Sequence, residues 1–174
     1  MKHIHEFEVK KLLRMASEAK EKAYAPYSNF RVGACLKASS GAYYLGCNIE
    51  NAAYTPTVCA ERSAMFKAVY EGEREFEAIA IISDCMNYTS PCGVCRQVLA
   101  EFCDPDMPVI CADRDGNYQM FELQELIPMA FTKKDMDISE GGLCFYFLFL
   151  IYNISTCSLL QLRAAAEHYQ HFLF

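Results

Sequence analysis

The sequence predicts an α/β fold, a three-layer α/β/α sandwich with a mixed five-stranded sheet. Segments with apolar side chains at helical spacing alternate along the chain with short apolar segments typical of strands. Helices that alternate with strands are typical of a sheet covered by helices on both faces. The composition agrees, because 53% of the 174 residues are hydrophobic and 22% are charged, which suits one globular domain with one core.

The N-terminal part of the chain predicts a helix followed by a hairpin. Apolar residues recur at helical spacing over residues 6–25, and Pro26 ends that pattern. Residues 30–38 are predicted to form a strand and residues 42–47 its partner. The reason is that Ser39-Ser40-Gly41, which lies between them, is a typical hairpin turn.

The alternation continues after a polar loop. A second helix is expected to have Thr55 or Thr57 as its N-cap and Pro56 in its first turn, and to end at Gly72. The remaining predicted elements are a strand over residues 78–83, a helix that opens at Ser90-Pro91 and buries Cys95, Val98, Leu99 and Phe102, a strand over 109–112, a turn over 113–117, a strand over 118–121 and a short helix over 123–127.

We expect residues 1–137 to form the folded domain and residues 138–174 to be an atypical apolar tail. Within the tail, residues 143–154 are almost wholly apolar, but twelve residues are too few to cross a bilayer as a helix. Two interpretations are open for the tail. It is either an extra helix buried against the domain or another subunit, or a stretch foreign to the native fold.

Charge and cysteine usage exclude several classes of partner. The formal net charge is −6, and an acidic balance opposes binding of nucleic acid, which needs clustered positive charge. The N-terminal residues 1–6 are polar and carry no apolar stretch of signal-peptide length. Ten cysteines without an export signal indicate a reducing compartment. We therefore expect a cytoplasmic protein that binds a small molecule and neither nucleic acid nor membrane.

Two short motifs carry the chemistry, Cys59-Ala60-Glu61 and Pro91-Cys92-Gly93-Val94-Cys95, and both lie at predicted helix starts. Cys92 and Cys95 are three residues apart, so their sulfurs lie on one helix face and can chelate one ion. The unpaired amides of a helix start also stabilise thiolates. In a first turn, Cys59 and Glu61 can both reach an ion beyond the helix end. We predict one zinc ion held by Cys59, Cys92 and Cys95, with the fourth position open to water, as in catalytic sites.

Glu61 and Arg62 complete the predicted centre. A Cys or His, then x-Glu, then Pro-Cys-x-x-Cys is the signature of zinc deaminases, in which the glutamate is a general acid/base and not a ligand. Three thiolates outweigh the charge of one zinc ion and weaken its Lewis acidity. A guanidinium at Arg62 that donates hydrogen bonds to the sulfurs would restore that acidity. The alternative for Arg62 is an ordinary surface charge on an exposed helix.

The resemblance to a known family goes further than this signature. The chain resembles the homotetrameric cytidine deaminases over roughly residues 6–135, with several specific motifs in the expected order. The tail departs from that pattern. The segments that carry the resemblance are residues 25–34 (APYSNFRVGA), 48–54 (NIENAAY), 59–62 (CAER), 91–97 (PCGVCRQ) and 126–131 (LIPMAF).

The resemblance implies hydrolytic deamination of free cytidine and 2′-deoxycytidine in pyrimidine salvage. It further implies one zinc per subunit and a homotetramer whose subunits complete one another's active sites. The substrate-binding residues that it implies are Asn48 and Glu50 on the ribose hydroxyls, Phe30 stacked on the base, the backbone of Ala60 on the pyrimidine carbonyl, Tyr54 in the same loop as Asn48, and Phe131 reaching the site of an adjacent chain.

Three alternatives to this function are open. A nucleotide or nucleic-acid deaminase is disfavoured, because most of those have histidine as the first ligand where this chain has Cys59, and because no basic stripe is present. An aminonucleoside-antibiotic deaminase of the blasticidin type shares the three-cysteine site. A structural zinc module would require a fourth cysteine as a ligand and would not need Glu61.

The remaining cysteines of the domain have an ordinary interpretation. They lie in apolar or strand-like stretches, and free cysteine is among the most often buried residue types. Three ligands and a water already complete the zinc. We therefore predict buried thiols at Cys35, Cys47, Cys85, Cys103 and Cys111.

Overall fold

The computed structural model describes residues 2–136. The chain divides into two compact units, Met1–Thr132 and Lys133–Phe174, and the architecture below is that of the first. In the second unit, the structure describes the 3-10 helix Lys133–Met136. The tail expected over residues 138–174 lies outside the described residues, so the domain boundary at residue 137 stays a prediction.

Every predicted helix and strand of the first unit is present and in the predicted order. The elements are α1 (Glu6–Lys20), β1 (Val32–Ala38), β2 (Tyr43–Cys47), α2 (Ala60–Tyr70), β3 (Phe76–Ser83), α3 (Gly93–Phe102), β4 (Pro108–Ala112), β5 (Tyr118–Glu122) and α4 (Leu123–Leu126).

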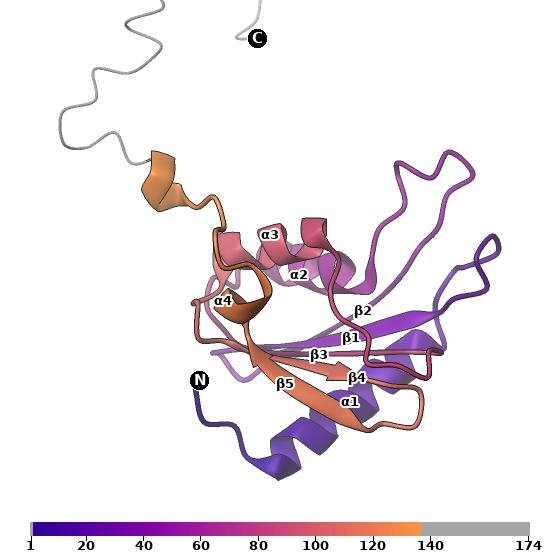
Figure 1. Ribbon diagram of the computed structural model, residues 1–174, viewed down its shortest axis with the longest axis horizontal. Helices are drawn as coiled ribbons and strands as arrows, with labels where there is room; N and C mark the ends of the chain where they lie inside the picture. Colours follow the sequence, from indigo (N-terminus) through magenta and orange to yellow (C-terminus); the bar gives the residue numbers. More distant parts are fainter. Residues whose placement is uncertain (1, 137–174) are drawn as a thin grey trace, which may run out of the picture. The chain divides into compact units, whose positions relative to one another are not determined.

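The strands form one five-stranded sheet in the order β2-β1-β3-β4-β5. Strands β3 and β4 are parallel, and the other neighbouring pairs are antiparallel. Helices α2, α3 and α4 lie on one face of this sheet and α1 on the other (Figure 1). The prediction of a three-layer α/β/α sandwich with a mixed sheet is therefore confirmed.

Side chains of the central strands alternate between two apolar clusters, one on each face of the sheet. On the α2 and α3 side, Ile79 and Ile81 are fully buried with Met65. On the α1 side, Ala80 is buried with Leu12. A strand covered on both faces is apolar at nearly every position, which explains why β3 is the most continuous apolar segment of the domain.

Two strand glycines set how closely the helices approach the sheet. A Cβ added at Gly33 would stand 2.5 Å from the backbone nitrogen of Lys20 in α1. A Cβ added at Gly46 would collide with the carbonyl oxygen of Ala60 and stand 2.5 Å from the nitrogen of Ala64, both in α2. The backbone of each helix therefore rests directly on a strand, at positions where no side chain fits.

Gly46→Ala is expected to destabilise the protein and to displace the start of α2. Overpacking a tight core site costs about 1–3 kcal/mol, and here the colliding groups are backbone, which yields little. Thermal unfolding measures the loss. Gly93→Ala is the matched control, because a Cβ at Gly93 meets nothing within 4 Å and the φ angle is ordinary. Equal melting temperatures for the two variants would contradict this account of the helix–strand contact.

The predicted starts of α2 and α3 are wrong by a few residues. The N-cap of α2 is Cys59 and not Thr55 or Thr57, and the N-cap of α3 is Cys92, not Ser90. Neither cysteine makes a side-chain capping bond. Threonine and serine are preferred N-cap residues because their hydroxyls can bond the first helix amides. At both helices a cysteine takes this position instead, and its sulfur makes no bond to those amides.

Helix α1 ends at Lys20, five residues before the predicted end at residue 25. The reason is a long-range contact with the loop that follows β2. Tyr24 N donates to the carbonyl of Asn48 at 3.0 Å, and Glu50 N donates to the carbonyl of Tyr24 at 2.8 Å. These bonds draw Tyr24 into an extended bridge, and the helix has to stop before it.

No helix within residues 2–136 is long and apolar enough to cross a membrane.

Candidate active site

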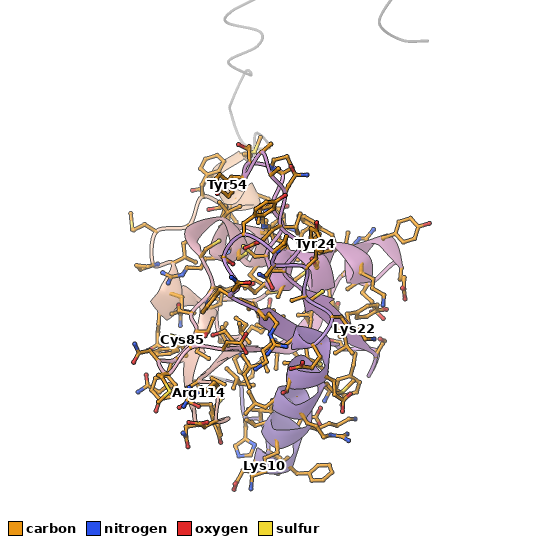
Figure 2. All side chains as sticks on the ribbon, turned by 90° about the vertical axis from the view of Figure 1, so that its right-hand side faces the viewer. Lys10, Lys22, Tyr24, Tyr54, Cys85 and Arg114 are labelled. Carbon is orange, nitrogen blue, oxygen red and sulfur yellow. The ribbon has the colours of Figure 1, made fainter. Side chains whose placement is uncertain are left out.

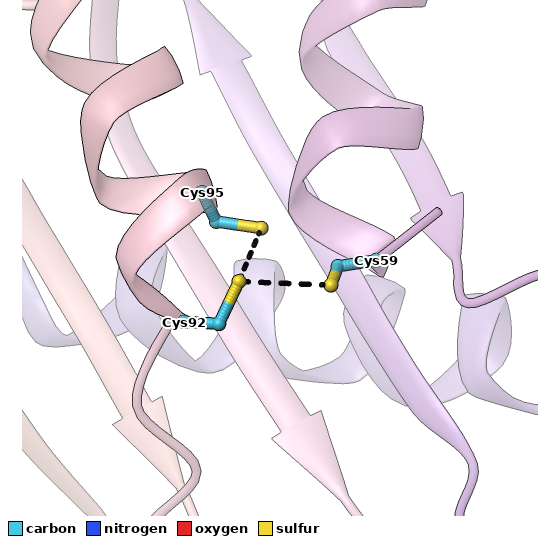
Figure 3. Close-up of side chains that lie close together, drawn as sticks. All are labelled: Cys59, Cys92 and Cys95. Atoms are coloured by element: carbon cyan, nitrogen blue, oxygen red, sulfur yellow. Dashed lines mark hydrogen bonds between the residues drawn. The ribbon is translucent and has the colours of Figure 1, made fainter. Parts of the chain in front are cut away.

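Helices α2 and α3 start next to each other and bring three cysteine sulfurs together (Figure 3). Cys59 and Cys92 are the N-cap residues, with extended backbones, and Cys95 lies in the first turn of α3. The sulfur of Cys92 lies 3.8 Å from that of Cys59 and 3.5 Å from that of Cys95. The two motifs, thirty-three residues apart in sequence, form one cluster.

The cluster has the dimensions of a zinc site. Tetrahedral coordination with Zn–S bonds of about 2.3 Å places two sulfurs about 3.8 Å apart. The three sulfurs all lie within 4.8 Å of one another, and they form the one such group of metal-ligating side chains found within residues 2–136. Three thiolates suit zinc and leave a fourth tetrahedral position for a water or a substrate atom.

The electrostatics of the cluster favour a bound cation. A hydrogen bond from the Cys95 thiol lowers the pKa of Cys59 to about 5, and Arg62 contributes to the same shift. The hydrogen bond to Cys59, together with burial, raises the pKa of Cys95. At neutral pH the cluster therefore holds at least one thiolate, which is an anionic ligand that can bind a metal cation.

Arg62 lies against the cluster. Its Nη2 donates to the sulfur of Cys59 at 3.6 Å and to the carbonyl of Thr57 at 3.1 Å. The side chain is half-buried, so Arg62 is not an ordinary exposed charge. A guanidinium that donates to a ligand sulfur withdraws charge from it.

Glu61 is the second residue of α2 and is only 4% exposed. Burial raises the pKa of this carboxyl group to about 7. The side chain lines a cleft together with Cys59 and Cys92. A carboxyl group with a pKa near neutrality can both take up and release a proton at physiological pH, which is what a general acid/base requires.

The cleft has a volume of about 490 Å³, within the range of small-molecule sites. It lies where β1 starts and where β2 and β3 end, since Val32 pairs with Ser83 and Gly33 with Cys47. Its lining residues are Ser28, Phe30, Val32, Asn48, Glu50, Thr57, Cys59, Glu61, Thr89, Ser90 and Cys92.

Asn48 is a buried residue of this cleft that also holds the chain around it. Its Oδ1 accepts from the backbone N of Val32 at 2.8 Å, and its Nδ2 donates to the carbonyl of Phe30 at 2.8 Å. The side-chain oxygen can accept one more hydrogen bond because it has two lone pairs, and the side-chain nitrogen can donate one more because it carries two hydrogens. Asn48 therefore positions Phe30 and can still bind a ligand hydroxyl.

Glu50 holds the segment that precedes Phe30. Its Oε2 accepts from the backbone N of Tyr27 at 2.9 Å and of Ser28 at 3.2 Å, and its Oε1 accepts from the Ser28 hydroxyl. The Ser28 hydroxyl and these backbone amides hold the pKa of Glu50 below its usual range. Glu50 is therefore an ordered carboxylate on the wall of the cleft, whereas Glu61, with its raised pKa, can take up a proton near neutral pH.

Three of the predicted substrate residues do not line the cleft. Ala60 is fully buried at the start of α2, while Tyr54 is 73% and Phe131 is 61% exposed. Tyr54 packs edge-to-face on Tyr27, with ring centroids 6.2 Å apart, and the carbonyl of Phe131 accepts from Gln97 Nε2 at 2.6 Å. The Tyr54 side chain lies at the opposite end of the domain from Lys10 (Figure 2).

Sequence reasoning missed several polar residues of the cleft, namely Ser28, Thr57, Thr89 and Ser90. Ser28 lies within the recognised segment 25–34, and Ser90 directly precedes the segment 91–97, so their positions in the sequence pointed to the site. Thr89 had none, because its place depends on a bond between its hydroxyl and that of Ser83, the last residue of β3.

The other cysteines of the domain are free thiols, and their burial varies. Cys35 and Cys111 are buried as predicted, whereas Cys47, Cys85 and Cys103 are half-buried. Burial raises the pKa of Cys35 and of Cys111 to about 12. The prediction of five buried thiols is thus correct for two of them and too strong for the other three.

Comparison with known proteins decides which family this site belongs to. Residues 7–111 match the family model described as the cytidine and deoxycytidylate deaminase zinc-binding region. The chain belongs to this deaminase family. The matched range contains all three cysteines of the cluster, Glu61 and every residue that lines the cleft.

Relatives within the deaminase family match most of the described chain. A cytidine deaminase of Sporosarcina psychrophila is 50% identical over 129 residues, which cover 74% of this chain and 95% of the relative. A cytidine deaminase of Halalkalibacterium halodurans is 48% identical over 126 residues, covering 72% and 96%. The crystal structure of cytidine deaminase from Burkholderia pseudomallei superposes with a TM-score of 0.68 at 43% identity, covering 70% of this chain and 98% of that one.

Proposed function

We propose that this chain catalyses the zinc-dependent hydrolysis of free cytidine and 2′-deoxycytidine to uridine and 2′-deoxyuridine, with release of ammonia. The observation that carries the proposal is a buried, protonatable Glu61 beside a three-thiol cluster in a cleft of nucleoside size. Family membership supports the same reaction. The proposed role of the enzyme is pyrimidine salvage.

Cys59, Cys92 and Cys95 would hold the zinc ion, which would act as a Lewis acid and lower the pKa of a water molecule toward neutrality. Glu61 is the proposed proton carrier. Its carboxylate takes one proton from the water as the water oxygen bonds to C4, and delivers this proton to the ring nitrogen N3. It then takes the proton of the new C4 hydroxyl and delivers it to the amino group as the C4–N bond breaks, so that water and cytidine become uridine and ammonia. Arg62 donates to the sulfur of Cys59 and withdraws charge from it, which would preserve the Lewis acidity of a bound zinc ion.

The substrate contacts are proposed from the residues that line the cleft. Asn48 and Glu50 bind the ribose hydroxyls with the hydrogen-bonding capacity that they keep beyond their own backbone contacts. Phe30, which is 40% exposed, offers an aromatic face to the base. The amide of Ala60 lies in the first turn of α2, where amides have no intrahelical partner, and is proposed to bind the pyrimidine carbonyl.

Two alternatives are less well supported. A structural zinc module needs a closed site, whereas the cluster within the described residues has three ligands and an adjacent cleft. A structural zinc module would also leave the burial of Glu61 unexplained, although burying a carboxyl group costs free energy. An aminonucleoside-antibiotic deaminase remains chemically similar, but the matched relatives cited above carry the name cytidine deaminase.

An ultraviolet assay tests the proposed reaction. Purified protein should remove the absorbance that distinguishes cytidine from uridine. Prolonged treatment with a chelator should abolish this activity, and added zinc should restore it, because metal-free protein lacks the Lewis acid. Chelator-resistant turnover, or no turnover of cytidine by zinc-loaded protein, would contradict the proposal.

Glu50→Ala is expected to lower kcat/KM for cytidine by about 10- to 100-fold, since a hydrogen bond to a charged group is worth about 1.5–3 kcal/mol. Zinc content should not change. Cytosine lacks the sugar, so its turnover should be at least about a hundredfold below that of cytidine in the wild type.

The matched control is Glu73→Ala. The carboxylate of Glu73 also accepts a bond from a serine hydroxyl, that of Ser40, but it lies outside the cleft. This variant should keep wild-type kinetics. A Glu50→Ala enzyme with unchanged kinetics on cytidine, or efficient deamination of cytidine monophosphate, would refute the role assigned to this loop.

We also propose a homotetramer in the cytoplasm, in which Phe131 serves the site of a neighbouring chain and Tyr54 contributes to substrate binding. Both side chains are exposed in the single chain, and large exposed aromatic residues often mark an interface. Light scattering during size-exclusion chromatography measures the assembly. A fully active monomer would show that the active site needs no neighbouring chain.

A further inference from the structure

The guanidinium of Arg96, on the first turns of α3, binds three separate points of the chain. Its Nε donates to the carbonyl of Pro91 at 2.7 Å, its Nη1 to the carbonyl of Leu126 at 2.8 Å, and its Nη2 to the hydroxyl of Ser90 at 2.9 Å. All three nitrogens therefore have a partner. The side chain is half-buried, where such bonds are less exposed to competition from water.

Two of these acceptors lie immediately before a proposed zinc ligand. Ser90 and Pro91 lead into Cys92, and the carbonyl of Cys92 accepts from the backbone N of Arg96 at 2.9 Å. Arg96 thus fixes the backbone on both sides of the Cys92 side chain. The third acceptor, Leu126 in α4, connects this arrangement to the end of the sheet, because α4 directly follows β5.

Cys92 is the ligand that most needs such support. It is the exposed member of the cluster, whereas Cys95 is 1% exposed and Cys59 is half-buried. As an N-cap it has helix on one side only, and the residues that precede it belong to a loop. Farther back, this loop is attached by Thr89, whose N donates to the carbonyl of Ala112 at 3.0 Å.

We propose that Arg96 is a positioning residue of the metal centre, which holds Ser90 and Pro91 in place and thereby keeps the sulfur of Cys92 directed at the zinc. The inference rests on the proposed zinc site. The planar guanidinium makes three bonds in fixed directions, and a lysine ammonium cannot reproduce them from one point. Groups that orient metal ligands typically affect metal affinity or activity by about 10- to 100-fold when removed.

The test compares zinc release from Arg96→Lys and wild-type protein. Zinc-loaded protein is mixed with an excess of a chromogenic chelator, and the rate of zinc transfer is followed. Arg96→Lys should release zinc about 10- to 100-fold faster. Ser90→Ala, which removes one acceptor only, should give a smaller acceleration and covers the case in which Arg96→Lys does not fold.

Arg74→Lys is the matched control. The Nη1 of Arg74 donates to the carbonyls of Val69 at 2.8 Å and of Glu73 at 2.7 Å, so this arginine also binds backbone carbonyls near a helix end, but away from the cluster. Its zinc release should equal that of the wild type. Melting temperatures of both variants separate a general loss of stability from a local effect on the metal.

Cobalt-loaded protein gives a second readout, because the cobalt absorption bands report ligand geometry without any turnover. Altered bands and faster release in Arg96→Lys, with neither change in Arg74→Lys, would support the inference. Wild-type release rates and bands in both Arg96→Lys and Ser90→Ala would overturn it, while leaving the proposed function intact if the wild type binds zinc and deaminates cytidine. Wild-type protein that binds no zinc would overturn both.

Discussion

Glu61→Gln is expected to keep its fold and its zinc while losing at least about 10²- to 10⁴-fold in kcat for cytidine. The substitution preserves the shape of the side chain but removes the group that titrates. Glutamine cannot accept a proton from water near neutral pH, whereas burial places the pKa of Glu61 at about 7. Because one carboxyl group is proposed to serve several proton transfers, the loss should lie at the upper end of that range or beyond it.

Initial rates from ultraviolet absorbance and zinc content from elemental analysis measure the two halves of this prediction. Glu101→Gln is the matched control, because it makes the same chemical change at an exposed glutamate of α3. That variant should be indistinguishable from the wild type. Turnover by Glu61→Gln within a few-fold of wild type would exclude Glu61 as the proton carrier.

Cys92→Ala and Cys95→Ala are expected to lose the bound zinc, and activity should fall at least as far as in Glu61→Gln. Each variant leaves two thiols, which cannot complete a three-ligand catalytic site. Stability should fall as well, because a bound metal that joins the starts of α2 and α3 adds its binding free energy to that of folding. Elemental analysis and thermal unfolding with and without added zinc measure both effects.

Cys85→Ala is the control for these variants. Cys85 is a half-buried free thiol outside the cluster, so its removal should leave zinc content and activity unchanged. A full complement of zinc in Cys92→Ala or Cys95→Ala would disprove the ligand assignment. Loss of zinc from Cys85→Ala would instead indicate that the metal lies elsewhere.

The order of elements and the layers of the fold were predictable because their signals are local. The apolar run of β3 and the helical spacing of Leu12 and Ala16 in α1 each depend on a few neighbouring residues. Boundaries failed where distant contacts decided them. Helix α1 stops early because Tyr24 pairs with the loop after β2, and no pattern within residues 6–25 contains that information.

The starts of α2 and α3 show a conflict between local preference and chemistry. Capping preferences indicate Thr57 or Ser90, whereas the structure places Cys59 and Cys92 at the N-caps. An N-cap residue whose side chain bonds the amides of its own helix cannot direct that side chain at a zinc ion lying between the two helix starts. The sulfurs instead face each other across 3.8 Å, and the helices begin without a side-chain capping bond.

By itself, the sequence determined the type of chemistry. Cys59-x-Glu61 and Cys92-x-x-Cys95 place ligands and acid/base within single helical turns, and geometry over three residues follows from helix formation alone. Tertiary structure decided everything that depends on distance between segments or on exclusion of water. The order of the strands brought Cys59 to Cys92, and burial raised the pKa of Glu61 to about 7. Packing also placed Arg96 behind Cys92, a role that no short pattern encodes, because its partners include Leu126, thirty residues away.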